Sequence, residues 1–138
     1  VCNRQPWRVH VHTTPESISR VIVHQNGNRG FGDTASVLLT VTCDLRAFAG
    51  AQERNEAFVD GGMFAMSLVY ALHSLGLGCC CLNLCQQTDE ASRAKKAAGV
   101  SECEVLIMMI AVGTLPPKLR VARSTRQPLE SLLVLHES

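Results

Sequence analysis

The chain has 138 residues, and 13 Lys and Arg against 12 Asp and Glu give it a formal net charge of +1. Hydrophobic residues make up 46% of the chain and charged residues 18%, which excludes a disordered chain, because such chains lack the apolar surface that offsets the entropy of ordering. The balanced charge predicts no nucleic-acid partner, and the length predicts a single domain over residues 1–138.

The first half of the chain predicts two strands with a helix between them. Alternating Val and His indicate a half-buried strand at residues 8–13. A helix is expected at residues 15–24, because Thr14 is typical of an N-cap and proline follows it. After a loop rich in glycine and asparagine, a β-branched apolar run at residues 36–43 indicates a buried strand.

The second half predicts two further helices and two further strands. A long helix is expected at residues 56–75, and it is apolar on almost all sides, which indicates burial on more than one face. A strand at residues 79–84, a helix at 88–98 and a strongly apolar strand at 104–112 follow, and then a basic tail. This alternation of strands and helices predicts one layered domain of α and β structure.

The apolar stretch at residues 57–78 is long enough to span a bilayer, but it contains Asp60, His73 and four glycines. A charge near the middle of a membrane helix costs roughly 2.5–3.5 kcal/mol. We therefore expect no membrane span and a buried or interface helix instead.

The seven cysteines indicate reduced thiols in a cytoplasmic protein, because an odd number cannot pair fully within one chain. Cys81 and Cys85 have the spacing of a ligand pair, but no second pair follows, so no metal is expected. A thiol- or metal-dependent protein built on Cys79, Cys80, Cys81 and Cys85 stays open as a minor alternative.

Residue chemistry alone predicts no catalytic pair. The glycines of the loop at residues 25–33 follow a helix and precede a strand, whereas a dinucleotide-binding loop needs the reverse order. No cysteine occupies a recognisable nucleophile motif. Asp60 is the only acid inside a buried-looking segment, and a hydrogen-bonded helix residue is the simpler interpretation.

Two polar segments each allow two interpretations. The tail residues Arg120, Arg123 and Arg126 are either a phosphate site or a solvated basic tail. Near the start, Asn3 and Gln5 carry amides that both donate and accept hydrogen bonds. With Pro6 expected to hold Gln5 extended, this amide pair either binds the edge of a planar heterocycle or forms a structured turn anchored by Trp7.

Four segments, in chain order, carry a resemblance to a known family. They are the Asn-Arg-Gln-Pro-Trp turn at residues 3–7, the helix from Asp60 into Gly78, the strand that ends at Val112 and Gly113, and the Ser-x-Arg-x-Pro segment at residues 124–128. Together they resemble the FMN-dependent nitroreductase-like flavoproteins, over essentially the length of the chain.

The resemblance implies an α+β layered fold with a central mixed or antiparallel sheet flanked by helices. It also implies an intertwined homodimer, with the long helix in the dimer core and FMN at the interface. The implied reaction passes a hydride from NAD(P)H to FMN and then electrons to a nitroaromatic, quinone or related small acceptor, so that the flavin carries the chemistry and no catalytic side chain is expected.

The resemblance further implies where the cofactor is bound. Asn3 and Gln5 would line the flavin, and Asn28 would lie near its pyrimidine edge. Asn83 and Leu84 would turn backbone N–H groups toward the flavin N5. Ser124 and Arg126 would hold the phosphate.

The sequence also departs from the family pattern. The family begins with helices that carry an Arg-Ser-x-Arg phosphate segment, and neither precedes the Asn-Arg-Gln-Pro-Trp turn here. We therefore expect a domain that lacks the family's N-terminal helices and part of the phosphate cage. The alternative function is an inactive family member with weak or no FMN binding.

Overall fold

The computed structural model describes residues 2–85 and 88–136. The order of elements predicted from the sequence is confirmed, and the observed bounds differ from the predicted ones by at most two residues. The strands and main helices are β1 (Trp7–His12), α1 (Pro15–Ile22), β2 (Val37–Asp44), α2 (Glu56–Ser74), β3 (Leu77–Leu82), α3 (Thr88–Ala98) and β4 (Glu104–Thr114).

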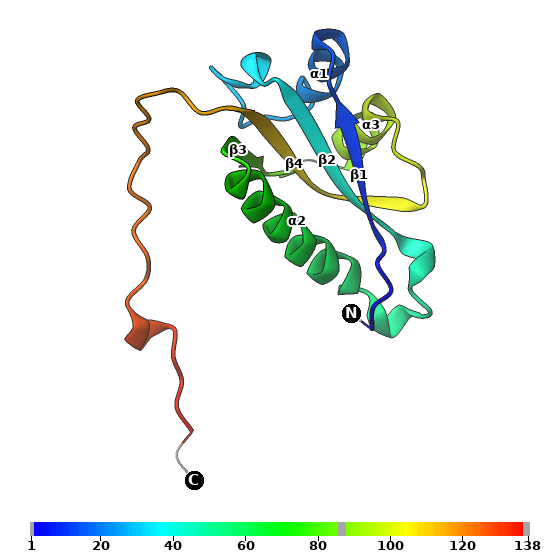
Figure 1. Cartoon of the computed structure of the whole chain (residues 1–138). Coiled ribbons are helices and arrows are strands. Elements are labelled where there is room, and N and C mark those ends of the chain that lie inside the picture. The colour runs from blue at the N-terminus through cyan, green and yellow to red at the C-terminus, as the bar shows by residue number, and fades with distance from the viewer. Residues whose placement is uncertain (1, 86–87, 137–138) are drawn as a thin grey trace.

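The four strands form one antiparallel sheet in the order β1-β2-β4-β3. Helix α2 lies along one face of this sheet, and α1 and α3 lie on the other (Figure 1). The layered α+β architecture is therefore confirmed, and the sheet, left open as mixed or antiparallel, is antiparallel throughout the described residues.

Side-chain alternation along β2 supplies both halves of the hydrophobic core. Leu38 belongs to the cluster that includes residues of α1 and α3, whereas Leu39 and Val41 belong to the cluster beneath α2. All three are buried. A strand that is apolar on both faces is typical of a sheet covered by helices on both sides.

Small residues let α2 lie close to the sheet. Ala57, Gly61 and Ala65 recur at every fourth position and are buried, so they share the inward face of the helix. A Cβ on Gly61 would lie 2.6 Å from Cγ1 of Ile107. The helix ends before Gly76, whose φ of +75° suits a glycine at the end of a helix.

The opposite face of α2 is apolar and exposed. Met63 and Tyr70 are each 66% exposed, and further large apolar side chains on the helix are open to solvent, namely Phe58, Val59 and Met66. The expected burial of α2 on more than one face is therefore not met within one chain.

A β-bulge interrupts the pairing of β2 with β4. Val41 lies opposite Met108, but Thr42 lies opposite Leu106, so that Ile107 is the extra residue. Ile107 and Met108 both pack against the cluster beneath α2. Beyond the bulge, the side chain of Glu104 accepts a hydrogen bond from Thr42 Oγ1.

The segment after β4 leaves the sheet and runs away from it, coloured orange to red in Figure 1. Residues 115–136 are exposed, including the apolar side chains of Leu129, Leu132 and Leu135. Within the described part of the chain, no helix has the length and apolar character needed to cross a membrane.

Candidate functional site

The two amides of the turn before β1 lie together. Gln5 Nε2 donates a hydrogen bond to Asn3 Oδ1 at 2.8 Å, and both side chains are exposed. The prediction that Pro6 holds Gln5 extended is wrong, because Gln5 has a φ of +50°. Asn3 also has a positive φ, at +53°, so the backbone curls and brings the two side chains within hydrogen-bond distance.

Arg4, between the two amides, ties this turn to the segment that precedes α2. Its Nη1 donates to the backbone oxygen of Ala47 at 3.0 Å and to Glu53 Oε2 at 2.8 Å. Its Nη2 lies 2.6 Å from Glu53 Oε1, and its guanidinium lies 5.9 Å from the centre of the Phe48 ring. Sequence reasoning missed this contact, because nothing in the spacing of Arg4 and Glu53 brings them together.

Trp7 anchors the other end of the turn, as predicted. Its ring stacks on Phe64 of α2, with the ring centres 5.0 Å apart and the planes 13° apart. An offset or parallel aromatic pair adds to the stability that area burial alone provides. The turn is therefore held between the loop before α2 and the helix itself.

Asn28 and Asn83 come from distant segments, and Gln25 joins them. Asn28 Nδ2 donates to the backbone oxygens of Ile22, at 3.0 Å, and of Gln25, and it lies 3.2 Å from Gln25 Oε1. Gln25 Nε2 donates to the backbone oxygen of Asn83 at 2.8 Å. Gln25 is 4% exposed. Its place in the polar loop after α1 does not distinguish it in the sequence from its neighbours.

Leu84 continues this group toward the core. It is half-buried and packs against the cluster that includes residues of α1 and α3. The backbone N–H of Cys85 lies 3.4 Å from Asn83 Oδ1, which closes a turn immediately after β3. The site residues predicted on this side of the sheet are thus in contact, directly or through Gln25.

Ser124 and Arg126 lie in the tail. Arg126 Nη1 donates to the backbone oxygen of Ser124 at 3.2 Å and also to Ser124 Oγ. Both residues are exposed. The predicted phosphate pair is therefore brought together locally.

The predicted site residues form three groups in one chain: the amide pair, the Asn28–Asn83–Leu84 group, and the tail pair. Among residues 2–85 and 88–136, no hydrogen bond joins a residue of one group to a residue of another. The hydrogen bonds among the described residues therefore link the predicted site residues only within each group.

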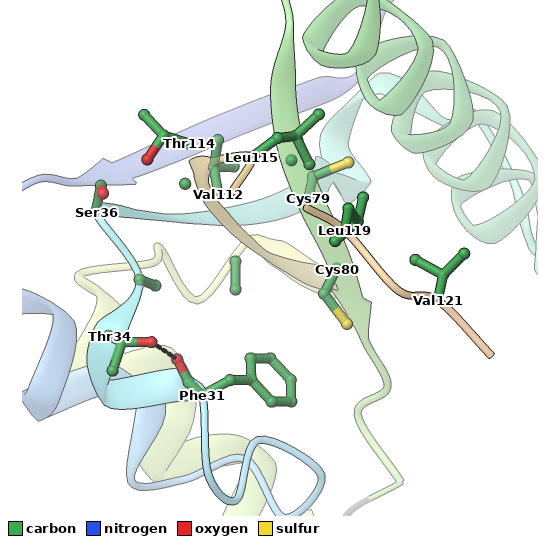
Figure 2. A pocket seen from close by; sticks show the side chains of 14 residues that line it. Phe31, Thr34, Ser36, Cys79, Cys80, Val112, Thr114, Leu115, Leu119 and Val121 are labelled. Atoms are coloured by element: carbon green, nitrogen blue, oxygen red, sulfur yellow. Dashed lines mark hydrogen bonds between the residues drawn. The ribbon is translucent and has the colours of Figure 1, made fainter. Parts of the chain in front are cut away.

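A pocket of about 440 Å³ opens elsewhere, at the edge of the sheet (Figure 2). Phe31 from the loop after α1 and Leu119 and Val121 from the tail line it, together with Cys79 and Cys80 of β3. Neither a charged side chain nor any of the seven predicted site residues is among the described residues that line this pocket. It is an apolar hollow that one chain leaves open.

Two cysteines of β3, Cys79 and Cys81, lie in surroundings that disfavour thiolate. Burial raises the pKa of the Cys79 and Cys81 thiols above the usual range. In the part of the chain that the structure describes, no three His, Cys, Asp or Glu side chains are grouped so that they could hold a metal ion. The thiol- or metal-dependent alternative therefore gains no support from the described geometry.

Solved structures of other proteins are similar to this fold. A Staphylococcus epidermidis protein described as a candidate NAD(P)H:FMN oxidoreductase superposes with a TM-score of 0.83 at 16% identity, over 98% of this chain and 78% of its own. A nitroreductase family protein from Streptococcus pneumoniae gives 0.76 at 18% identity, over 97% and 80% of the two chains. An FMN-dependent nitroreductase from Clostridium difficile gives 0.69 at 14% identity, over 86% and 69%.

Comparison with curated protein sequences gives no match. The sequence profile of the nitroreductase family, in contrast, matches residues 16–114. This span runs from α1 to the end of β4 and covers well over half of the chain. The chain belongs to the nitroreductase family.

Proposed function

We propose that the chain is a subunit of an FMN-dependent oxidoreductase that takes electrons from NAD(P)H and passes them to a nitroaromatic, quinone or related small acceptor. The observation that carries the proposal is the hydrogen-bonded link from Asn28 through Gln25 to Asn83. It joins two segments that the family resemblance assigns to the same flavin. The free thiols of the chain are consistent with a cytoplasmic protein.

The residues present fit the chemistry of FMN. Asn3 and Gln5 expose uncharged amides, which suit the mixed donors and acceptors at the edge of the flavin ring. Ser124 and Arg126 offer a hydroxyl and a guanidinium, which suit a phosphate group. When bound, FMN would supply the hydride and electron transfer. The protein would bind and orient it.

We further propose that the working form is a homodimer with FMN at the interface. Three observations support this. The outward face of α2 is apolar and exposed, with Met63 and Tyr70 each 66% exposed. The tail carries exposed leucines beyond the sheet. No hydrogen bond joins the three groups of site residues in the described part of one chain, and a second copy would allow groups from two chains to converge.

A family member with weak or no FMN binding is the second candidate. One observation favours it: the predicted phosphate pair, Ser124 and Arg126, lies in the exposed tail. A phosphate site whose residues are unsupported by the body of the protein binds less tightly, because ordering the tail opposes binding.

The visible absorption spectrum of the purified protein, with and without added FMN, separates the two candidates. Flavin bands in the purified protein, or quenching of FMN fluorescence on titration, together with NADH or NADPH oxidation in the presence of a quinone, are the results expected of the oxidoreductase. FMN fluorescence that stays unquenched at protein concentrations well above that of FMN contradicts it and favours the second candidate.

A further inference from the structure

Gln25 occupies a position that neither the family motifs nor the sequence patterns single out. We propose that Gln25 is a positioning residue that sets the direction of the Leu84 backbone N–H and couples it to Asn28. The proposal rests on the proposed FMN function, because it concerns two of the segments that would contact the flavin.

The Gln25 amide is held in one orientation by its partners. Its Oε1 accepts from the backbone N–H of Gly27 at 2.7 Å and lies 3.2 Å from Asn28 Nδ2. Its Nε2 donates to the backbone oxygen of Asn83 at 2.8 Å. If the amide were flipped, its NH₂ group would face the donors of Gly27 and Asn28, and its oxygen would face the carbonyl oxygen of Asn83. The partners therefore permit a single orientation.

The hydrogen bonds of the Gln25 amide matter for stability because the side chain is buried. Gln25 is 4% exposed, and a buried amide that loses its partners is not compensated by water. The hydrogen bond from Gln25 Nε2 therefore holds the Asn83 carbonyl to the loop after α1. Moving either segment alone would break this bond and leave the buried amide without a partner.

The contact with Asn83 also determines where a second group points. The carbonyl of Asn83 and the N–H of Leu84 belong to one planar trans peptide unit, in which they point in opposite directions. Because Gln25 Nε2 holds the carbonyl, the N–H of Leu84 is directed away from Gln25. This N–H is one of the two that would face the flavin N5.

Two glycines allow the loop to close around Gln25 and Asn28. A Cβ on Gly27 would lie 3.2 Å from Gln25 Nε2, and a Cβ on Gly32 would lie 2.5 Å from Asn28 Oδ1. The loop therefore fits tightly around both amides. A change at Gln25 is expected to shift Asn28 and the turn after β3 together.

Two substitutions separate the two halves of the amide. Gln25→Glu keeps the acceptor for Gly27 but, when ionised, loses the donor to the Asn83 carbonyl. Gln25→Met keeps the length of the side chain and loses both. The matched control is Asn26→Asp, which makes the same amide-to-carboxylate change one residue away on an exposed side chain. Far-UV circular dichroism verifies that each variant is folded.

The expected result has three parts. At about pH 8, both Gln25 variants bind FMN roughly tenfold more weakly and shift its visible absorption bands, the scale expected when a buried hydrogen bond is lost. For Gln25→Glu alone, affinity recovers as the pH is lowered toward about 6, because burial raises the carboxyl pKa and the protonated acid again donates to Asn83. In NMR spectra without FMN, the signals of the Leu84 N–H and the Asn28 side-chain amide both shift in the Gln25 variants, and neither shifts in Asn26→Asp.

The proposal is overturned if the Gln25 variants match the control in affinity and flavin spectrum, or if the Leu84 and Asn28 signals do not move together. A native chain that binds no FMN removes the proposed function instead. In that case the NMR comparison still decides whether Gln25 couples the two segments, so the two failures are distinguishable.

Discussion

Arg4 and Glu53 form a two-pronged ion pair, with Arg4 Nη1 2.8 Å from Glu53 Oε2 and Nη2 2.6 Å from Oε1. Glu53 Oε2 also accepts from the backbone N–H of Ala49 at 2.6 Å. The hydrogen bonds from Arg4 and Ala49 hold the pKa of the Glu53 carboxyl below its usual range. The turn that carries Asn3 and Gln5 is thereby tied to the segment before α2.

We predict that Arg4→Lys weakens FMN binding severalfold while leaving the fold intact. Lysine keeps the charge but presents a single ammonium, so it cannot occupy both carboxylate oxygens and the Ala47 carbonyl in the planar geometry of a guanidinium. Fluorescence titration with FMN measures the effect. Arg54→Lys, the same change on an exposed neighbouring residue, is the control, and equal affinities in the two variants would contradict the prediction.

Adjacent glycines in α2 are expected to respond oppositely to alanine. A Cβ on Gly61 would lie 2.6 Å from Ile107 Cγ1 and 3.0 Å from Cys43 Sγ, whereas a Cβ on Gly62 meets nothing within 4 Å. Gly61→Ala should lower the free energy of unfolding by about 1–3 kcal/mol through overpacking. Gly62→Ala should raise it by about 0.5–1 kcal/mol through helix propensity. Urea denaturation of both variants measures the difference, and shifts of the same sign would refute it.

His12 is expected to make the protein less stable below neutral pH. Burial, with the nearby positive groups His10 and Arg20, lowers the pKa of His12. The unfolded chain takes up a proton on this residue at about pH 6.5, while the folded chain resists it, so the free energy of unfolding falls as the pH drops below that value. The slope is at most about 1.4 kcal/mol per pH unit for one proton.

Substitution of His12 tests this dependence. His12→Gln should flatten the pH dependence of the free energy of unfolding between about pH 7 and pH 5. His136→Gln, on the exposed tail, should leave the slope as it is in the native chain. An unchanged slope in His12→Gln would show that another group is responsible.

The outward face of α2 is expected to form the subunit interface. Met63→Glu places a charge on a side chain that is 66% exposed in one chain, so an isolated subunit should tolerate it. In a dimer the same charge would be buried without a partner, and the dimer should dissociate. Light scattering after gel filtration gives the mass. Val23→Glu, also exposed but at the C-terminal cap of α1, is the control, and a Met63→Glu dimer as tight as the native one would argue for a different interface.

Arg126 is expected to contribute to binding of the FMN phosphate. Arg126→Ala should weaken FMN binding by roughly 1.5–3 kcal/mol, the range for a hydrogen bond to a charged group. Arg120→Ala, the same change at another exposed arginine of the tail, should weaken FMN binding much less. Isothermal titration calorimetry measures both, and unchanged affinity in Arg126→Ala would remove Arg126 from the site.

The helices and strands could be predicted from the sequence because each carries a local signal. Thr14 caps α1 by accepting from the N–H of Ser17, and the alternation of Val9 and Val11 with histidines marks β1. The closeness of Asn3 to Gln5, and of Ser124 to Arg126, is also local, since a single residue lies between the two members of each pair.

The contacts that position the site could not be predicted in this way. Gln25 meets Asn83, and Arg4 meets Glu53, only because the fold brings distant segments together. The left-handed backbone at Gln5 was missed for a related reason. The general preference of a residue before proline for extended structure is overridden here by a turn held on both sides, by Arg4 and by the Trp7 ring.

The β-bulge in β4 determines which side of the sheet carries charge. With Ile107 as an extra residue, Leu106 pairs with Thr42 and Glu104 with Asp44, so Glu104 reaches Thr42 and His10. Regular pairing would turn Glu104 to the apolar face beneath α2, because a shift of one residue reverses every side chain beyond it. The effect of a deletion in this strand therefore depends on its position. Removing Ile107 alone would leave Glu104 opposite Asp44 in a regular ladder, whereas removing Val105 would place Glu104 opposite Cys43, on the face beneath α2.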